Sequence, residues 1–298
     1  MCSYPLLAAP LQSFITIFEP SGLTHVGNGE FILVEDEVKQ PFHRLKVSPI
    51  DGLIELGEVA IVGDGVRLND LEGVAFDGRY LYAITSHSLT KKGKTGRDRT
   101  QLVRFEYLNG ELHQAGRVQD LKPALVRRFS SSMPEKSKDK ISASINIEAL
   151  AWSPLDESLY VGFRKPRLNG KSAVLRIHQP GLMFEQQTAE GFEISVSWLD
   201  LGGDGIRSMN WNPTLQGLVI VSGGKKSSGK GFELWQWPAM PDSPALKITN
   251  LEAPLPAGTE GLATFIANQQ SGLLLVIDDG KAKKEKGAHY QLFWFDAL

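Results

Sequence analysis

The chain has 298 residues, of which 42% are hydrophobic, so it is long enough to bury a full core in one or two domains. Its formal net charge of −2 excludes a globally basic nucleic-acid-binding protein, although charge can still be segregated on the surface. The single cysteine, Cys2, excludes an internal disulfide and a cysteine zinc site, and no apolar stretch approaches the roughly 20 residues that span a bilayer.

A short phrase recurs five times and divides the chain into repeats. Its clearest copy is Leu71–Ser88, where two β-favouring runs flank Asp77-Gly78, and Asp-Gly between such runs is a strong hairpin signal. Equivalent points of the copies are spaced by 51, 76, 59 and 53 residues, at Gly22, Gly73, Ala149, Ser208 and Gly261. A period of this length is close to that of a four-stranded propeller blade and too long for ankyrin or leucine-rich repeats.

Each hairpin is followed by β-rich runs that can complete a blade. The third strands are expected at Phe42–Val47, Leu102–Leu108, Ala173–Ile177, Phe232–Trp237 and Tyr290–Phe295. The fourth strands of the first four repeats are expected at Ile54–Val62, Ala115–Leu121, Glu193–Leu201 and Ala245–Leu251. The fifth repeat has no room for a fourth strand. We expect Ser13–Phe18, a strand without a hairpin partner, to supply it and close the ring between the termini.

The sequence therefore predicts a single all-β domain, residues 1–298, folded as a five-bladed β-propeller. Two alternatives stay open, a six-bladed propeller with a blade hidden in residues 121–144 and an irregular β-sandwich with coincidental repeats. In residues 121–144, Leu121, Leu125 and Phe129 have helical spacing and the remainder is polar. We interpret this segment as a helical excursion from the propeller, followed by a mobile surface loop.

The repeated phrases also carry a resemblance to a known family. At DLEGVAFDGRYLYAITSHSLTKKGK, NIEALAW, DGIRSMNW and TEGLA…LLLVIDDG, the chain resembles domain-of-unknown-function family 3616, a bacterial family without an assigned activity. The resemblance extends from about Ser21 to the C-terminus. That family looks related to the calcium-dependent phytases and the gluconolactonase-like lactonases, which implies a propeller fold. The phytase motifs for calcium and phosphate do not align here, so the resemblance assigns no catalytic residue.

Polar residues stand where a propeller brings its blades together around the axis. The starts of the innermost strands carry Ser21, Glu72, Glu148, Arg207 and Glu260. The ends of the second strands, on the same face, include the acidic residues 35–37, Asp278 and Asp279. Carboxylates that converge repel one another unless an arginine, a metal ion or raised pKa values compensate.

Two interpretations of this acidic centre are open. The residues could hold Ca²⁺ or Mg²⁺, because hard cations prefer several oxygen ligands. The candidate metal ligands are Glu72, Glu148, Glu260 and Asp278. Alternatively, the carboxylates brace neighbouring blades through hydrogen bonds and an ion pair with Arg207.

Basic residues gather in the loops that follow the second strands, on the same expected face. Half of the 32 lysine and arginine residues lie in four loops, residues 88–100, 164–171, 224–230 and 280–287. A basic rim around an acidic, cation-holding centre suits a small anionic ligand or substrate, and phosphate esters fit best. The alternative is that these loops are merely solvated.

These features favour a divalent-cation-dependent hydrolase, of phosphoesterase or lactonase type, that acts on a small anionic substrate. In this interpretation Arg164 and Arg207 neutralise substrate charge and His87 carries protons, although His87 could instead be a structural histidine held by its serine neighbours. The alternative function is a non-catalytic propeller that binds an anionic ligand or a partner protein.

Other partners are disfavoured. Trp152, Trp211 and most other aromatic residues fall inside strand patterns, where packing between blades is a better explanation than ligand stacking, and the centre is acidic, so nucleic acid is an unsuitable partner. The first ten residues lack the basic segment of a secretory signal, and we expect a soluble cytoplasmic protein without a membrane partner.

Overall fold

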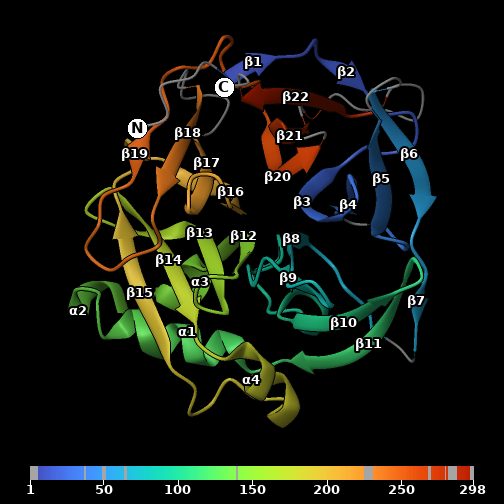
Figure 1. Ribbon diagram of the computed structural model, residues 1–298. Coiled ribbons are helices and arrows are strands. Elements are labelled where there is room, and N and C mark those ends of the chain that lie inside the picture. The colour runs from blue at the N-terminus through green and yellow to red at the C-terminus, as the bar shows by residue number, and fades with distance from the viewer. Residues whose placement is uncertain are drawn as a thin grey trace.

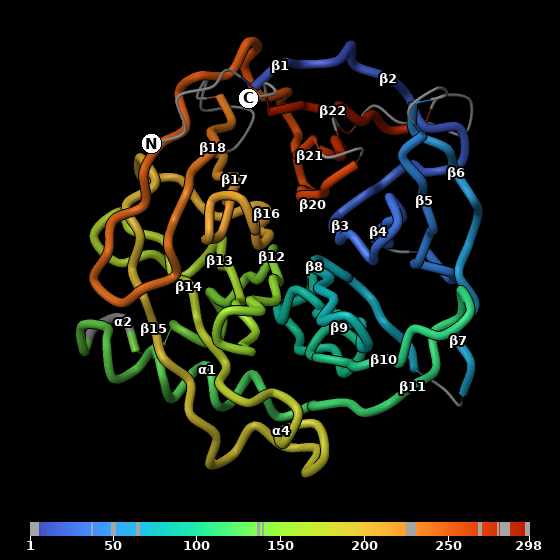
Figure 2. The backbone as a smooth tube through the Cα atoms, in the orientation of Figure 1, coloured from blue at the N-terminus to red at the C-terminus, as the bar shows by residue number. Residues whose placement is uncertain are grey.

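The computed structural model describes residues 6–36, 38–48, 52–63, 66–138, 140–224, 231–267, 270–278, 280 and 287–295. These residues form a five-bladed β-propeller whose blades surround a central axis (Figures 1 and 2). The prediction of five blades is confirmed, and the six-bladed and sandwich alternatives are excluded. No helix in the described ranges has the length and apolar character of a membrane span.

The blades follow one another in chain order, and each begins with its innermost strand. Blade 1 consists of β3 (Pro20–Gly27), β4 (Glu30–Glu35), β5 (Phe42–Ser48) and β6 (Gly52–Glu58). Blade 2 consists of β8 (Leu71–Phe76), β9 (Tyr80–Thr85), β10 (Leu102–Leu108) and β11 (Glu111–Val118). Blade 3 consists of β12 (Asn146–Ser153), β13 (Ser158–Leu168), β14 (Lys171–Ile177) and β15 (Ile194–Leu199). Blade 4 consists of β16 (Gly205–Asn212), β17 (Gly217–Gly223), β18 (Phe232–Trp237) and the two-residue β19 (Leu246–Lys247).

The last blade joins the two ends of the chain. Its strands are β20 (Thr259–Ala267), β21 (Gln270–Ile277) and β22 (His289–Phe295), and the N-terminal segment adds β1 (Leu6–Ala8) and β2 (Gln12–Ser13), both antiparallel to β22. Closure by an N-terminal strand is confirmed, but its predicted position, Ser13–Phe18, is wrong.

The chain bends away from β22 after Ser13, because the next side chains are buried in the core and the next backbone N–H groups bind a glutamate side chain instead of a neighbouring strand. Phe14 and Ile17 are both buried in the core between blades 5 and 1. The backbone N–H groups of Ile15 and Thr16 donate to the carboxylate of Glu55 on β6, at 2.6 and 2.9 Å. A strand ladder would need those groups, so pairing with β22 ends at Ser13.

A second boundary also differs from the prediction. The run Ile54–Val62 was expected as one strand, but it forms β6 and then β7 (Ile61–Val62), which pairs in parallel with β11 of the next blade. Between the two strands, Val59 is buried and its N–H donates to the carbonyl of Phe42. The chain therefore passes from blade 1 to blade 2 within this run.

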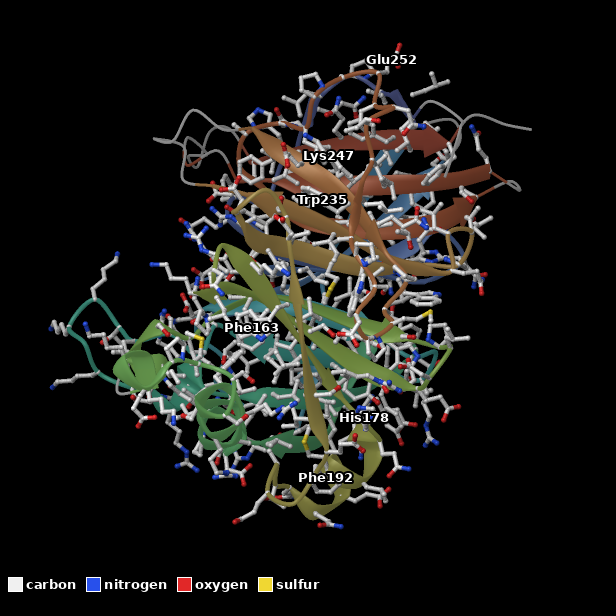
Figure 3. All side chains as sticks on the ribbon, turned by 90° about the vertical axis from the view of Figure 1, so that its left-hand side faces the viewer. Phe163, His178, Phe192, Trp235, Lys247 and Glu252 are labelled. Carbon is white, nitrogen blue, oxygen red and sulfur yellow. The ribbon has the colours of Figure 1, made fainter. Side chains whose placement is uncertain are left out.

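Helices occupy the long connections of blades 2 and 3. The expected helix is α1 (Leu121–Ser130), and its three predicted apolar residues are all fully buried. The rest of the excursion is more ordered than predicted, since it contains α2 (Glu135–Lys138) and α3 (Ile141–Ser144). Phe129 packs edge-on against Phe163 of β13 with 5.1 Å between ring centroids, which attaches the excursion to blade 3. Figure 1 shows α1 beside the strands of blade 3, and Figure 3 labels Phe163. The remaining helices are a short 3₁₀ turn, η1 (Arg97–Arg99), and α4 (Pro180–Gln186).

Small residues let the innermost strands approach one another around the axis. The equivalent points of the five repeats are glycine, alanine or serine, and they lie where β3, β8, β12, β16 and β20 pack side by side (Figure 2). At Gly73 an added Cβ would lie 2.7 Å from the backbone nitrogen of Leu150 on the next inner strand. At Ser208 the hydroxyl accepts a hydrogen bond from the N–H of Leu262, 2.9 Å away, which links blades 4 and 5.

We expect Gly73→Ala to lower the free energy of unfolding by about 1–3 kcal/mol, because the added methyl group meets backbone that cannot move independently. Urea denaturation measures the change. Gly181→Ala is the matched control, since nothing lies within 4 Å of its Cβ position in α4, and that protein should be as stable as the wild type or more so. Equal stability of the two variants would contradict close packing at Gly73.

Candidate active site at the starts of the innermost strands

A β-bulge near the start of every innermost strand directs one side chain toward the axis. The pairing register with the second strand skips one residue in each blade. The skipped residues are Ser21, Glu72, Glu148, Arg207 and Glu260. Because a bulge inserts an unpaired residue and re-aims its side chain, it explains why these five predicted positions share one face of the ring.

Three of these residues form a continuous ion-pair chain across three blades. Arg207 Nη1 donates to Glu148 Oε2 at 2.7 Å and to Glu260 Oε2 at 2.9 Å. Arg164, at the end of the predicted second strand of blade 3, donates to the other oxygen of Glu148 at 2.8 Å. Asn146 Nδ2 donates to that same oxygen at 2.7 Å. Asn146 was not among the predicted site residues, and its only signal in the sequence is its place two residues before Glu148.

Burial raises the pKa values of two of the glutamates. Loss of hydration raises the pKa of Glu260 to about 8, and the negative charge of Glu148 adds to the rise while Arg207 opposes it. Burial also raises the pKa of Glu72 well above its usual value, reinforced by the charges of Glu148 and Asp70. The ring therefore combines a glutamate bound by two guanidinium groups with two carboxyl groups whose pKa values are raised.

The predicted cation ligands do not assemble as a cation site. Within the described part of the chain, no three His, Cys, Asp or Glu side chains lie together as a metal would require. Arg207 lies between Glu148 and Glu260 and donates hydrogen bonds to both, so its guanidinium occupies the place of a cation. Asp278 Oδ1 accepts a hydrogen bond from the N–H of Gly280 at 2.7 Å, and Asp279 lies outside the described residues. The geometry thus agrees with bracing by Arg207, and a Ca²⁺ or Mg²⁺ site stays a prediction.

His87 lies where a proton carrier cannot reach solvent. The residue is completely buried, with a left-handed backbone at φ 55°, and burial lowers its pKa to about 4. Its Nδ1 lies 2.9 Å from the carbonyl of Thr85, and Lys122 Nζ donates to the carbonyl of His87 at 2.8 Å. The ring contacts a backbone carbonyl instead of the predicted serines, and this geometry favours a structural role.

The serines beside His87 belong to a network that fixes the first basic loop. Asp70 accepts hydrogen bonds from Ser86, from Ser88 at 3.2 Å and from the guanidinium of Arg99. Arg99 also donates to Asn69 Oδ1 at 2.9 Å. Arg99, one of the basic residues predicted for the rim, therefore braces its own loop.

A pocket of about 710 Å³ opens beside the ion-pair chain. Three of the four predicted basic loops contribute to its wall, through residues 88–89, 164–167 and 223–224. Arg164 and Asn146 line it and both bind Glu148, so the pocket adjoins the ring directly. The basic residues of two of the four loops, at 225–230 and 281–286, lie outside the described residues.

The raised pKa of Glu260 gives a stability prediction. The unfolded chain releases this proton near pH 4.5 and the folded protein near pH 8, so between these values the folded state binds more protons and its stability falls as pH rises. We expect Glu260→Gln, which mimics the protonated acid, to match the wild type at pH 5 and to be more stable by roughly 3 kcal/mol at pH 8.5. Thermal melting across this range measures the difference, and parallel profiles would contradict the raised pKa.

Solved structures support the fold and no more. The chain is similar to CoXyl43, a β-xylosidase/α-arabinofuranosidase from a compost microbial metagenome, with 11% identity, a TM-score of 0.53 and coverage of 98% of this chain and 96% of that one. It is similar to the RS223 β-xylosidase, with 11% identity, a TM-score of 0.51 and coverage of 97% and 96%.

Sequence comparison gives the family. No curated protein matches the chain. The family described as protein of unknown function, DUF3616, matches residues 34–119 and 121–293, which is nearly the whole propeller and includes all the predicted ring residues except Ser21. The resemblance inferred from the repeated phrases is therefore confirmed, and the chain belongs to the DUF3616 family.

Proposed function

We propose that this propeller hydrolyses a small anionic substrate, such as a phosphoester, on the face where its innermost strands begin. The proposal rests on two carboxyl groups that bind the same guanidinium group and differ in protonation. Glu260 holds its proton at neutral pH, and Glu148, bound to the same guanidinium, is paired with Arg164 and Arg207. A proton donor beside a carboxylate is the arrangement that acid–base hydrolysis requires.

The pocket beside the ring suits the substrate. Its volume of about 710 Å³ falls within the usual range for small-molecule sites. Arg164, with 30% of its side chain exposed, can pair with a substrate anion while it holds Glu148. Lys165 and Arg167 add positive charge to the same wall, whose only acidic member in the described residues is Asp204. Guanidinium groups bind phosphate and carboxylate oxygens through two parallel hydrogen bonds.

Each residue then has a defined part in the reaction. Glu148 accepts a proton from a water molecule while the oxygen of that water forms a bond to phosphorus. Glu260 donates its proton to the ester oxygen while the bond between phosphorus and that ester oxygen breaks. Arg207, only 9% exposed, positions the two carboxyl groups. No step requires a divalent cation, since Arg164 neutralises the substrate charge that such an ion would otherwise meet.

A second candidate function is a non-catalytic propeller that binds an anion. The same pocket supports it, because Arg164, Lys165 and Arg167 would hold an anionic ligand whether or not chemistry follows. A partner protein in place of a small anion has no particular contact in its favour.

A substrate panel separates these functions. Metal-stripped protein is assayed against phosphate monoesters, lactones and carboxylic esters, with and without Ca²⁺ or Mg²⁺. We expect turnover of an anionic ester without added metal and a KM raised at least tenfold in Arg164→Gln, about 1.4 kcal/mol of lost binding. Arg79→Gln is the control, because that arginine is 66% exposed and pairs with Glu106 on blade 2.

The other outcomes decide against the proposal. Phosphate binding that needs Arg164, without turnover of any ester, would establish the binding function. Turnover that requires a divalent cation and is lost in Glu148→Gln would establish the metal-dependent hydrolase predicted from the sequence.

A further inference from the structure

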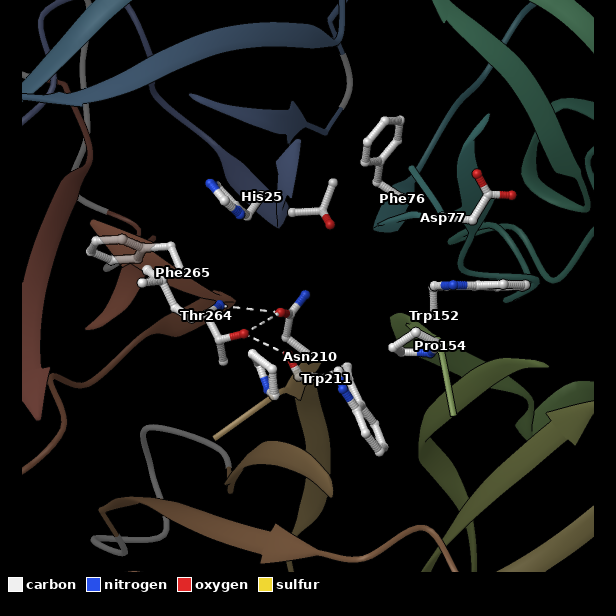
Figure 4. A pocket seen from close by; sticks show the side chains of 12 residues that line it. His25, Phe76, Asp77, Trp152, Pro154, Asn210, Trp211, Thr264 and Phe265 are labelled. Carbon is white, nitrogen blue, oxygen red and sulfur yellow. Dashed lines mark hydrogen bonds between the residues drawn. The ribbon is translucent and has the colours of Figure 1, made fainter. Parts of the chain in front are cut away.

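The opposite end of the axis also carries a pocket. Its lining comes from the ends of all five innermost strands and the turns that follow them, so it lies on the face opposite the ion-pair ring (Figure 4). The layer of small residues at Gly22, Gly73, Ala149, Ser208 and Gly261 lies between the two sites. We call this cavity of about 320 Å³ the lower cup.

Two deeply buried polar side chains line the lower cup with unused hydrogen-bonding capacity. Asn210 is 8% exposed, and its Oδ1 accepts hydrogen bonds from the N–H and the hydroxyl of Thr264, at 3.1 and 3.0 Å. Because an N–H can only donate, these bonds fix which amide atom is oxygen and turn the NH₂ group away from Thr264, toward the cup (Figure 4). Thr24 is 4% exposed, and its hydroxyl has no partner among the described residues.

Aromatic side chains form the rest of the wall. Phe76, Trp152, Trp211 and Phe265 line the cup from four different blades. Trp152 stacks on Tyr82 at an interplanar angle of 11°, so the packing between blades expected from the sequence is present, and part of the indole still lines the cup. Aromatic walls around a few fixed hydrogen-bonding groups are the usual composition of a site for a ring-shaped organic ligand.

The lower cup has one acidic residue in its lining, Asp77, and no lysine or arginine side chain among the described residues. Both oxygens of Asp77 are in use, since Oδ1 accepts from the N–H groups of Arg79 and Tyr80 and Oδ2 accepts from the hydroxyl of Tyr82 at 2.7 Å. His25 is neutral because burial lowers its pKa, and its buried Nε2 has no hydrogen-bond partner within the described chain. An anionic ligand would therefore lose hydration without gaining a counter-charge.

The geometry points to one ring of a neutral saccharide as the ligand of the lower cup. A sugar hydroxyl can accept from the Asn210 amide and can both donate to and accept from Thr24, while the C–H faces of the ring contact Trp152 and Phe76. The volume holds about one such ring, at the small end of ligand sites. This site is independent of the proposed hydrolysis on the other face.

Ligand-detected NMR tests the inference with D-glucose, D-galactose, D-mannose and D-xylose as probes. We expect saturation transfer from the wild-type protein to at least one sugar, with a dissociation constant of about 1 mM. Asn210→Asp keeps the acceptor for Thr264 but removes the amide donor, and Thr24→Val removes the hydroxyl at nearly constant volume. Each should weaken binding at least tenfold, while Thr95→Val, on an exposed loop of the opposite face, should not.

Three results would overturn the assignment. The first is no transfer to any of the four sugars. The second is transfer that is unchanged in both Asn210→Asp and Thr24→Val. The third is displacement of the bound sugar by tetramethylammonium or acetate at equal concentration, which would show that the lower cup prefers a charged ligand. Circular dichroism confirms that the variants are folded.

Discussion

Replacing Arg207 by methionine should lower the free energy of unfolding by about 3–5 kcal/mol at neutral pH. Arg207 is 9% exposed and is the shared partner of Glu148 and Glu260, which stand on two different blades. Without it, Glu148 retains only Arg164 and Asn146, and Glu260 loses the guanidinium that favours its ionised form. At neutral pH the cost falls on Glu148, a buried carboxylate that loses one of its two guanidinium partners, because breaking a buried pair by removing one member leaves charge uncompensated.

Urea denaturation at pH 5 and pH 8.5 tests this expectation. The deficit should be smaller at pH 5, where protonated Glu260 needs no counter-charge. Arg207→Lys is the matched control, because Nη1 alone donates the hydrogen bonds to Glu148 and Glu260 and one lysine ammonium can replace it. The lysine variant should lose much less free energy of unfolding than the methionine variant. A methionine variant as stable as the wild type would mean that Arg207 does not hold the ring together.

Glu260→Gln should reduce kcat by about 100- to 10,000-fold on whichever anionic ester the wild type hydrolyses, which is the usual effect of losing a general acid. Glutamine keeps the shape and the contact with Arg207 but has no acidic proton to donate. Inorganic phosphate should bind the variant and the wild type equally, because Arg164 is unchanged. Calorimetric titration with phosphate and steady-state kinetics on the same samples measure the two effects.

Glu111→Gln is the control for this substitution, because that glutamate is 52% exposed and pairs only with His113 among the described residues. An unchanged kcat in Glu260→Gln would mean that Glu260 takes no part in the reaction. An equal loss of phosphate binding and of turnover would mean that it acts in binding alone.

The repeat pattern of the sequence was sufficient to predict the five-bladed propeller, because each blade buries the same small set of positions. Gly22 and its equivalents are small because the inner strands touch there, and the third strands read as apolar runs because blades pack face to face. The closing strand was misplaced for the same reason. Phe14 and Ile17 are apolar because they fill the core, and an apolar pattern does not distinguish a packed bend from a strand.

The site was predicted in part. The starts of the innermost strands were correctly identified as the place where Glu148, Arg207 and Glu260 meet. The β-bulges that aim these side chains have no mark in the sequence, and neither does the choice between a cation and Arg207 as the positive partner of Glu148. That choice depends on distances across blades, which only the folded ring fixes. His87 was proposed as a proton carrier from its serine neighbours at a strand end, and these neighbours do not indicate that the side chain is buried.

The lower cup was not anticipated because its residues are typical of strand ends. Asn210 and Thr24 alternate with apolar residues and read as ordinary strand positions, and Trp152 and Trp211 read as packing residues. Their convergence follows from five strands that end around one axis. A single repeat gives no sign of it.

The most direct test of the proposed chemistry is a pH titration of the glutamate carboxyl groups by NMR, using protein labelled with ¹³C at the glutamate carboxyl carbons. We expect a glutamate that titrates near pH 8 and is missing in Glu260→Gln, because burial beside Glu148 keeps this acid protonated at neutral pH. Glu72, whose pKa is also raised, should keep its own high-pH titration in both proteins. If every glutamate titrates below pH 6, or if Glu260→Gln removes no titration above pH 6, the ring has no proton donor at that position and the acid–base mechanism is wrong.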